Sequence, residues 1–292
     1  MKNHIEGLRF RSLCLRALLL AVSATLLVWP LQAASDSSDE NASYVALGDS
    51  VAFGFDPLLP PGAADNFIGY PEIIEAAKHV QHVSKAINIA CPGETSGSFL
   101  STSVPDNGCH DYKAYVGLHT VYSGTQLSYA ASLLRSDKHI DLVTINLGGN
   151  DMRLLQAGCN YQAACIIAGL QPVLTAYGEN LTAIFQGLRV DAGFQGNIVL
   201  VTYYSPDYQD PLQTGAMYAL NAVATQVAGA FGVLIADGFA AFAQASASSG
   251  GRPCAAGLLV QLPDGSCDVH PSPAGRALLA DAVLTLIGKN RK

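Results

Sequence analysis

The chain has 292 residues, 50% of them hydrophobic and 13% of them charged, and its formal net charge at pH 7 is −7. An acidic chain whose Lys and Arg residues form no cluster beyond the N-terminus is poorly suited to binding nucleic acid or an anionic membrane surface. The length is sufficient for one α/β domain with a full hydrophobic core.

The N-terminus has the layout of a secretory signal peptide. A basic stretch ends at Arg16, an apolar run extends from Ala17 to Val28, and small residues follow at Ala33 and Ala34. The apolar run is too short to cross a bilayer comfortably, which favours a cleaved signal over an uncleaved anchor. We therefore expect a secreted or periplasmic protein in which residues 1–33 are removed and residues 34–292 form one domain with no stable membrane anchor.

Five apolar runs along the rest of the chain predict strands that are buried on both faces, which is typical of a parallel sheet. Amphipathic patterns between them predict helices, one of which has Pro172 in its first turn, and Ser272 is placed to cap a last helix. Alternating strands and helices favour a doubly wound α/β sandwich. In chain order, the predicted strands are 44–47, 86–90, 141–147, 197–204 and 232–236, and the helices are 125–136, 172–189 and 273–287.

The segment 216–243 is long and weakly polar, so a membrane span has to be considered. Polar residues such as Asn221 and Asp237 interrupt it, and glycines at 229, 232 and 238 divide it. A helix, a strand and a second helix within the buried core explain this pattern better than a membrane span does.

Six cysteines lie beyond the signal segment. An even number of cysteines in an exported chain indicates disulfide bonds. Many pairings are possible, and the sequence alone does not choose among them. The cysteines fall into three couples along the chain, and these are the bonds that we expect. We predict no metal site, because no C-x-x-C or H-x-x-x-H pair is present. The couples are Cys91 with Cys109, Cys159 with Cys165, and Cys254 with Cys267.

Polar residues follow three of the predicted strands at the point where each strand ends. Ser50 stands in "GDS" after the first strand, Gly93 in "CPGET" after the second, and Asn150 in "GGND" after the third. His270 stands in "CDVHPSP", just before the last helix. Because ligands bind beyond the carboxyl ends of strands in parallel α/β sheets, we expect these four residues to converge on one edge.

Each of these groups has a function in acyl transfer. A serine hydroxyl is a weak nucleophile until a nearby base such as histidine removes its proton. The tetrahedral intermediate carries an oxyanion that needs fixed hydrogen-bond donors. The amides of Ser50 and Gly93 and the side-chain NH₂ of Asn150 are candidate donors, and a glycine leaves room for an amide aimed into a pocket. Each motif alone is common in turns, so the prediction depends on their joint appearance in this order.

With these motifs the chain resembles the SGNH hydrolases, also called GDSL esterases and lipases, over essentially the whole length after the signal. The resemblance implies a flavodoxin-like, three-layer α/β/α sandwich with a parallel five-stranded sheet, and ester hydrolysis without a metal or cofactor. It also implies Ser50 as the nucleophile, His270 as the base, and Ser50, Gly93 and Asn150 as the oxyanion hole. The matched blocks are Gly48-Asp49-Ser50, Gly93, Gly148-x-Asn150-Asp151 and Asp268-x-His270-Pro271.

Two positions depart from the family pattern. Val51 replaces the usual leucine after the serine, which is a conservative change. The family normally has an aspartate three residues before the histidine, and that position is Cys267 here. We expect Asp268 to orient the imidazole instead, with Asp264 as a less favoured substitute and a backbone carbonyl as a further alternative. A bridge from Cys267 to Cys254 would then clamp the loop that carries the base.

An ordinary α/β-hydrolase is the main alternative enzyme. Its elbow motif is G-x-S-x-G, whereas Gly48-x-Ser50-x-Ala52 lacks the second glycine, and Ser50 follows the first strand instead of a later one. Asp49 and Asp151 flank the proposed site residues, and we interpret them as hydrogen-bond braces of their own turns.

The segments 53–70 and 99–122 are expected to determine the substrate. If they line an open acyl site, the protein is a monomeric esterase or lipase that acts on lipid or aliphatic esters. Three alternatives remain: the first segment packs onto the sheet, the tyrosines stack on sugars in a carbohydrate O-acetyl esterase, or the protein is a secreted binding protein that has lost catalysis. The apolar residues concerned are Phe53, Phe55, Leu58, Leu59, Phe67, Phe99, Leu100, Tyr112, Tyr115 and Tyr122.

Overall fold

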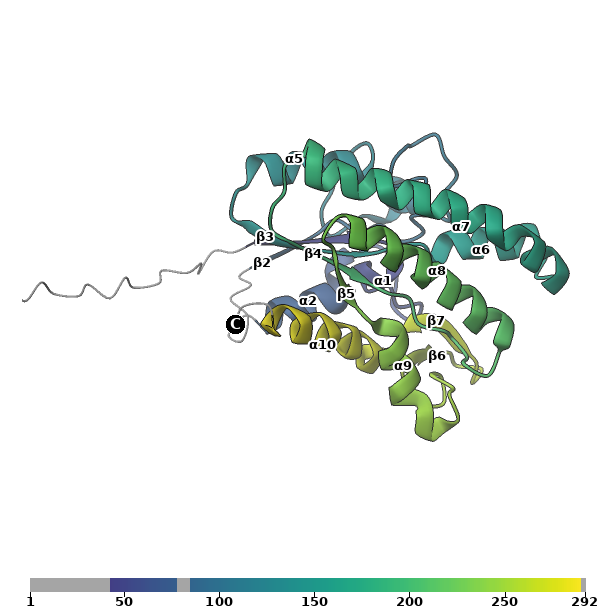
Figure 1. Ribbon diagram of the computed structural model, residues 1–292. Helices are drawn as coiled ribbons and strands as arrows, with labels where there is room; N and C mark the ends of the chain where they lie inside the picture. The colour runs from purple at the N-terminus through teal and green to yellow at the C-terminus, as the bar shows by residue number, and fades with distance from the viewer. Residues whose placement is uncertain (1–42, 78–84, 290–292) are drawn as a thin grey trace, which may run out of the picture. The chain divides into compact units, whose positions relative to one another are not determined.

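A parallel sheet of five strands forms the centre of the fold (Figure 1). The computed structural model describes residues 43–77 and 85–289, so the predicted signal peptide and its cleavage site lie outside the described residues. The order across the sheet is β2-β1-β3-β4-β5, so the chain places β2 on one side of β1 and then β3, β4 and β5 on the other. The strands are β1 (Ser43–Gly48), β2 (Lys85–Asn88), β3 (Ile140–Asn146), β4 (Asn197–Val201) and β5 (Leu234–Ala236).

Helices cover both faces of this sheet (Figure 1). The predicted three-layer α/β/α sandwich with a flavodoxin-like sheet is therefore confirmed, and the burial of β1, β3 and β4 follows from it. On one face α10 packs against α2 and α9, and on the other α7 packs against α8. The first group is α2 (Tyr70–Ala76), α9 (Gly238–Ser246) and α10 (Pro273–Lys289), and the second is α5 (Gln126–Ser136), α7 (Ala163–Gln186) and α8 (Pro211–Ala230).

The predicted last helix starts as its sequence indicates. The Gly275 amide donates to the Ser272 hydroxyl at 3.3 Å, and Pro273 occupies the first turn, where a missing N–H costs nothing. Leu279 and Val283 are buried along the face that meets the sheet. The segment 216–243 also divides as predicted, into α8, β5 and α9. No helix in the part of the chain that the structure describes combines the length and apolar character needed to cross a membrane.

Two elements differ from the prediction by more than two residues at one or both ends. The strand predicted over 197–204 ends at Val201, because the Asn221 side chain of α8 accepts from the Tyr203 amide at 2.9 Å and donates to its carbonyl at 2.7 Å. The helix predicted over 172–189 begins at Ala163, so that Pro172 lies inside it. Pro172 and Ala168 are both exposed, so water can bind the carbonyl that the proline leaves without a partner.

Each predicted cysteine couple is a disulfide. The Cα atoms lie 5.4 Å apart in Cys91–Cys109, 5.5 Å apart in Cys159–Cys165 and 5.9 Å apart in Cys254–Cys267. The third bond connects to a small antiparallel hairpin of β6 (Leu259–Gln261) and β7 (Cys267–Pro271), which the sequence did not predict. This hairpin carries Asp268 and His270.

Candidate active site

Ser50 is the first residue of α1 (Ser50–Phe53), which follows β1 almost directly. The Asp49 carboxylate caps this short helix by accepting the Val51 amide at 3.0 Å. Gly48 has a φ of +133°, and a Cβ there would lie 2.1 Å from the backbone oxygen of Asn146 on β3. Only glycine permits this close approach, which leaves Ser50 at the carboxyl edge of the sheet.

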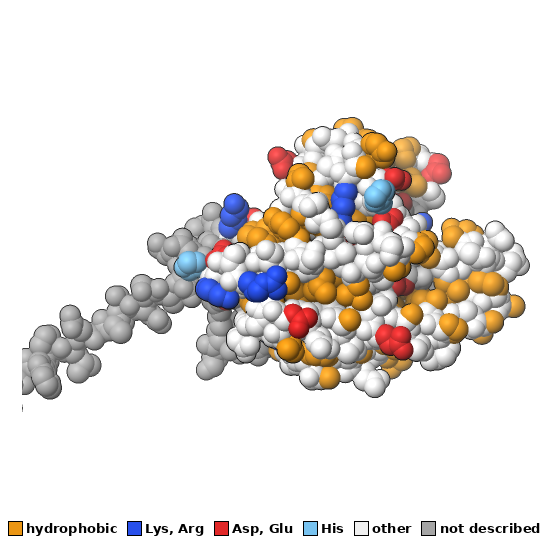
Figure 2. Space-filling model, turned by 90° about the horizontal axis from the view of Figure 1, so that it is seen from above, with side chains coloured by type: hydrophobic (Ala, Val, Ile, Leu, Met, Phe, Trp, Pro, Cys, Tyr) orange, Lys and Arg blue, Asp and Glu red, His pale blue; other side chains and the backbone are white. Residues whose placement is uncertain are grey.

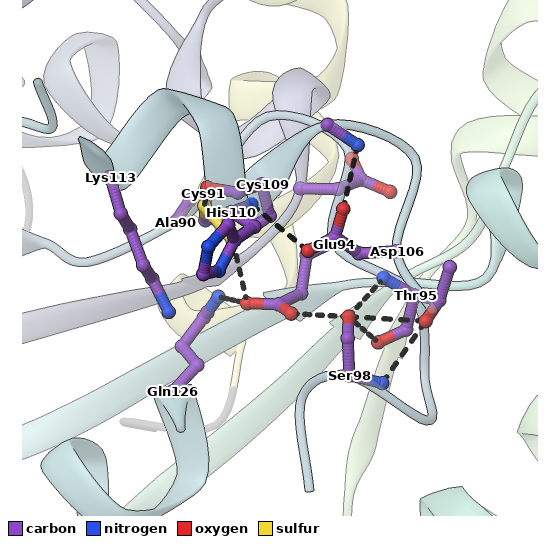
Figure 3. The surroundings of a disulfide bond; sticks show 12 residues. Ala90, Cys91, Glu94, Thr95, Ser98, Asp106, Cys109, His110, Lys113 and Gln126 are labelled. Atoms are coloured by element: carbon purple, nitrogen blue, oxygen red, sulfur yellow. Dashed lines mark hydrogen bonds between the residues drawn. A yellow bond between two sulfur atoms is a disulfide. The ribbon is translucent and has the colours of Figure 1, made fainter. Parts of the chain in front are cut away.

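Gln126, the first residue of α5, fixes the last residue of β1. Its Oε1 accepts the Gly48 amide at 2.6 Å, and its Nε2 donates to the Gly48 carbonyl at 3.0 Å and to Glu94 Oε2 at 3.0 Å. Glu94 lies beside the Cys91–Cys109 disulfide (Figure 3), and burial raises the pKa of its carboxyl group. The buried carboxamide therefore joins the serine turn to the loop that follows β2.

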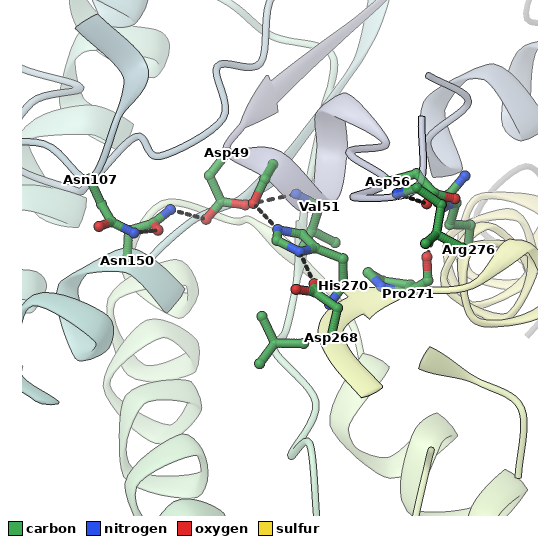
Figure 4. A network of polar contacts seen from close by, with 12 residues as sticks. Asp49, Val51, Asp56, Asn107, Asn150, Asp268, His270, Pro271 and Arg276 are labelled. Atoms are coloured by element: carbon green, nitrogen blue, oxygen red, sulfur yellow. Dashed lines mark hydrogen bonds and ion pairs between the residues drawn. The ribbon is translucent and has the colours of Figure 1, made fainter. Parts of the chain in front are cut away.

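His270 contacts Ser50 with one ring nitrogen and Asp268 with the other, and Figure 4 shows it beside Asp268. Its Nε2 is 2.8 Å from Ser50 Oγ, and its Nδ1 is hydrogen-bonded to Asp268 Oδ1. Asp268 also accepts the His270 backbone amide at 2.9 Å. Both residues belong to β7, where side chains two positions apart share a face. The strand therefore explains how an aspartate only two residues before the histidine reaches the ring.

Asp268 is held in its charged form. Burial raises its pKa, but the hydrogen bonds and charge of His270, together with the charge of Arg153, outweigh burial and leave the pKa of Asp268 below its ordinary value. A charged carboxylate on Nδ1 is suited to fix the tautomer in which Nε2 faces the serine. Asp264, the alternative orienter, bonds to Ser266 instead.

The strand that carries His270 is anchored by Arg276 from α10, a residue that the sequence analysis missed. Its guanidinium is buried and donates to the Pro271 carbonyl at 2.9 Å, the Ile68 carbonyl at 3.0 Å and Asp56 Oδ2 at 3.0 Å (Figure 4). These bonds connect β7 to the loop that follows α1. One cation thus ties the segment that carries His270 to the segment that follows Ser50.

Gly93 lies at the candidate site. The reason that this position needs a glycine differs from the one expected. Its φ is +87°, and a Cβ would lie 2.4 Å from the backbone oxygen of Asn107. The backbone of Asn107 therefore leaves no space for a side chain at this position. Lack of room in the pocket is not the cause. Gly93 and Ser50 both line the cavity, and neither amide donates a hydrogen bond to any group that the structure describes.

Asn150 projects from the start of α6 (Gly149–Gly158) toward the same point. Its Nδ2 donates to the Glu94 carbonyl at 3.0 Å and to Asp49 Oδ2 at 3.3 Å. Its Oδ1 accepts from Asn107 Nδ2 at 2.8 Å, which fixes the direction in which the NH₂ group faces (Figure 4). Asn107 lies in a loop with no motif of its own, so the sequence analysis missed this contact.

The two flanking aspartates do more than brace their own turns. Asp49 caps α1, but it also accepts from Asn150 and from the hydroxyl of Tyr203, which follows β4. Asp151 accepts from the amide of Ser96 at 3.0 Å and from its hydroxyl, so it holds the loop after β2. The predicted role as a brace of its own turn is confirmed for Asp49, which also bonds outside that turn, whereas Asp151 bonds to the loop after β2.

Burial raises the pKa of Asp49 to about 7, since it removes the carboxylate from water. Donation from Tyr203 and Val51 lowers the pKa of Asp49, and the nearby carboxylates of Asp151 and Glu94 raise it, but the effect of burial is the largest. Folded Asp49 thus keeps its proton to higher pH than unfolded Asp49. Its contribution to stability is full below its ordinary pKa of 3.8 and is lost as the pH rises through about 7.

We therefore expect Asp49→Asn to flatten the pH dependence of stability. In the wild type, this carboxyl group should reduce the free energy of unfolding by on the order of 4 kcal/mol between pH 4 and pH 7. The asparagine does not titrate, so urea denaturation at several pH values should show a smaller loss for the variant. Parallel pH profiles for the two proteins would contradict the raised pKa of Asp49.

A cavity of about 540 Å³ opens beside Ser50. Of the apolar residues expected to line it, only Phe55 and Tyr112 do so. Phe53, Phe67 and Phe99 are buried in the core, which favours the packing alternative for these rings. Further apolar side chains of the lining come from α6, α7 and α8. They are Met152, Ile166, Leu212, Ala216 and Met217.

Comparison with known proteins identifies the family and the fold of the chain. Residues 46–278 match the GDSL-like lipase/acylhydrolase family. Among solved structures, an acetylxylan esterase from Geobacillus stearothermophilus is 21% identical, covers 86% of this chain and 95% of its own, and has a TM-score of 0.56. Phospholipase A1 from Streptomyces albidoflavus NA297 is 20% identical, covers 84% of this chain and 99% of its own, and has a TM-score of 0.57. No curated protein sequence matches the chain significantly.

The fold is that of the SGNH-type hydrolases, and the two solved neighbours share it. The chain belongs to the GDSL-like lipase/acylhydrolase family, since the match covers most of its length. Family and fold together support ester hydrolysis as its chemistry.

Proposed function

We propose that the protein is a serine esterase in which Ser50 is the nucleophile, His270 the base and Asp268 the residue that orients His270. The observation that carries this proposal is the chain of contacts from Asp268 through His270 to Ser50 Oγ, which ends at the mouth of the cavity. A hydroxyl, a base and a carboxylate in this order form the arrangement that activates a serine.

In the proposed reaction, Ser50 Oγ attacks the ester carbonyl carbon while His270 Nε2 takes the hydroxyl proton. The oxyanion accepts hydrogen bonds from the amides of Ser50 and Gly93 and from the Asn150 NH₂ group. To donate to the oxyanion, the NH₂ group gives up its longer bond, which is the one to Asp49. The C–O bond to the alcohol then breaks, and His270 returns the proton to the leaving oxygen. Water, deprotonated by His270, then attacks the acyl carbon, the bond from that carbon to Ser50 Oγ breaks, and His270 returns the proton to Oγ as the acid leaves.

We infer that the substrate is a lipid or aliphatic acyl ester. Methionine and aliphatic side chains from α6, α7 and α8 line the cavity beside Ser50, and an acyl chain that enters it would be removed from water. The polar lining residues Gln156, Asp210 and Gln213 favour the second candidate, a carbohydrate O-acetyl esterase. We also propose export as the route by which the three disulfides form.

A fluorophosphonate probe followed by peptide mass spectrometry tests the nucleophile. We expect covalent labelling at Ser50, because only an activated serine reacts with the probe. Absence of labelling in a folded protein would favour a binding protein that has lost catalysis. Hydrolysis of p-nitrophenyl esters from acetyl to palmitoyl then tests the substrate class, since activity confined to the acetyl ester would contradict the acyl-chain proposal.

A further inference from the structure

The segment that covers the second half of α6 and most of α7 carries no formal charge. Between Arg153 and Glu179 there is no Asp, Glu, Lys, Arg or His. Figure 2 shows hydrophobic side chains at the right of the view, at the end where Figure 1 places α6 and the start of α7. A solvent-exposed helix normally has a charged or polar outer face, so this end lacks the usual pattern.

Large apolar side chains are exposed on this end. Tyr161 has 69% of its surface exposed, Ile167 has 62% and Leu154 has 36%. On α7, the small residues at 163 and 164 lie on the same helical face as Ile167 and are also exposed. We call Leu154, Tyr161 and Ile167 the arm surface. Scattered exposed apolar residues are ordinary, but several on one uncharged end mark a contact surface.

The arm surface continues into the cavity beside Ser50. Ile166 is buried and lines the cavity, whereas the next residue, Ile167, faces outward. Tyr161 does both, since it lines the cavity and is largely exposed. A ligand that lies on the arm surface is therefore beside the opening through which an ester reaches the serine.

The turn between α6 and α7 fixes the arm surface. The Cys159–Cys165 disulfide closes this turn, and Asn160 and Tyr161 have φ values of +46° and +59° within it. Non-glycine residues adopt this left-handed conformation only where the surrounding structure requires it. The exposed tyrosine is therefore held in place and does not belong to a loosely placed loop.

We propose that the arm surface docks onto the surface of aggregated, uncharged esters, such as droplets of neutral lipid, and delivers single molecules to the cavity. This rests on the proposed function, since it concerns the form in which the ester is presented. An uncharged apolar surface matches an uncharged apolar aggregate, and a chain with a net charge of −7 is poorly matched to an anionic membrane. The arm surface continues into the cavity beside Ser50. A surface that served only for association between copies of the chain would not need this connection.

The test compares Leu154→Gln/Ile167→Gln with the matched control Val121→Gln/Val190→Gln. The control residues are 84% and 67% exposed and do not line the cavity. On emulsified tributyrin we expect the arm variant to lose about tenfold in rate, since less apolar area is buried at the droplet. On monomeric p-nitrophenyl butyrate both variants should match the wild type, as neither Leu154 nor Ile167 lines the cavity.

Flotation of Ser50→Ala protein with triolein droplets measures docking without hydrolysis. Binding that the arm substitutions abolish supports the proposal even if no ester is cleaved, so docking and catalysis are tested separately. Equal emulsion rates for the arm variant and the control would overturn the proposal. A wild type that elutes as a dimer, together with an arm variant that elutes as a monomer, would also overturn it in favour of self-association. Thermal denaturation shows whether the arm variant is folded. If the double variant does not fold, the same measurements are made on Ile167→Gln alone.

Discussion

Replacing Ser50 with alanine should lower kcat for p-nitrophenyl esters by on the order of 10⁵-fold, since removal of an activated nucleophile leaves only binding and oxyanion stabilisation. In the structure Ser50 Oγ is the only side-chain atom bonded to His270 Nε2 among the described residues. Alanine removes that oxygen without disturbing the backbone of α1. The thermal stability of the variant should therefore stay close to that of the wild type.

The matched control is Ser103→Ala, which removes an exposed hydroxyl that does not line the cavity. Its kcat should equal that of the wild type. Steady-state rates with the butyryl ester, normalised to the concentration of folded protein, provide the comparison. A Ser50→Ala protein that retains wild-type turnover would place the nucleophile elsewhere.

Replacing Asp268 with asparagine should lower kcat by on the order of 10³- to 10⁴-fold. The carboxamide can still accept the His270 backbone amide, so β7 should keep its course, but it carries no charge to stabilise the imidazolium that forms during catalysis. KM should change little, since Asp268 acts through His270 and not on the ester. The effect on kcat with an intact fold is what separates orientation of the base from a structural role.

Asp264→Asn is the control for this prediction, because Asp264 is the other carboxylate near the histidine in sequence. It is fully exposed, and hydrogen bonds from Ser266 hold its pKa below its ordinary value. Its substitution should leave kcat within about twofold of the wild type, as expected for a surface change away from the site. If Asp264→Asn were the damaging change and Asp268→Asn the harmless one, the assigned orienter would be wrong.

The sheet and the order of the motifs along it could be predicted because each depends on local sequence. Buried strands such as β3 appear as unbroken apolar runs, and the turn after each strand lies next to it in the chain. The convergence of Ser50 and Asn150 then follows from the rule that parallel strands end at one edge. The three cysteine couples along the chain are the observed pairs, although the sequence alone left other pairings open.

The parts that could not be predicted depend on contacts between distant segments. The bond from Asn107 to Asn150 joins two loops, and no local pattern marks Asn107. Tyr203 reaches Asp49 only because β4 ends early, which Asn221 of α8 brings about. The aromatic residues of 53–70 were assigned in part to the substrate site, but an apolar side chain in a loop can face the core or a cavity, and sequence does not distinguish the two.

The hairpin of β6 and β7 has a consequence for how such enzymes are recognised from sequence. A search pattern that demands an aspartate three residues before the histidine passes over this chain, although its carboxylate reaches the same ring nitrogen. On a strand the useful spacing is two, and one inserted residue would turn the carboxylate to the opposite face. The conformation of the segment therefore decides which spacing works, and a motif defined by spacing alone describes only one of the available solutions.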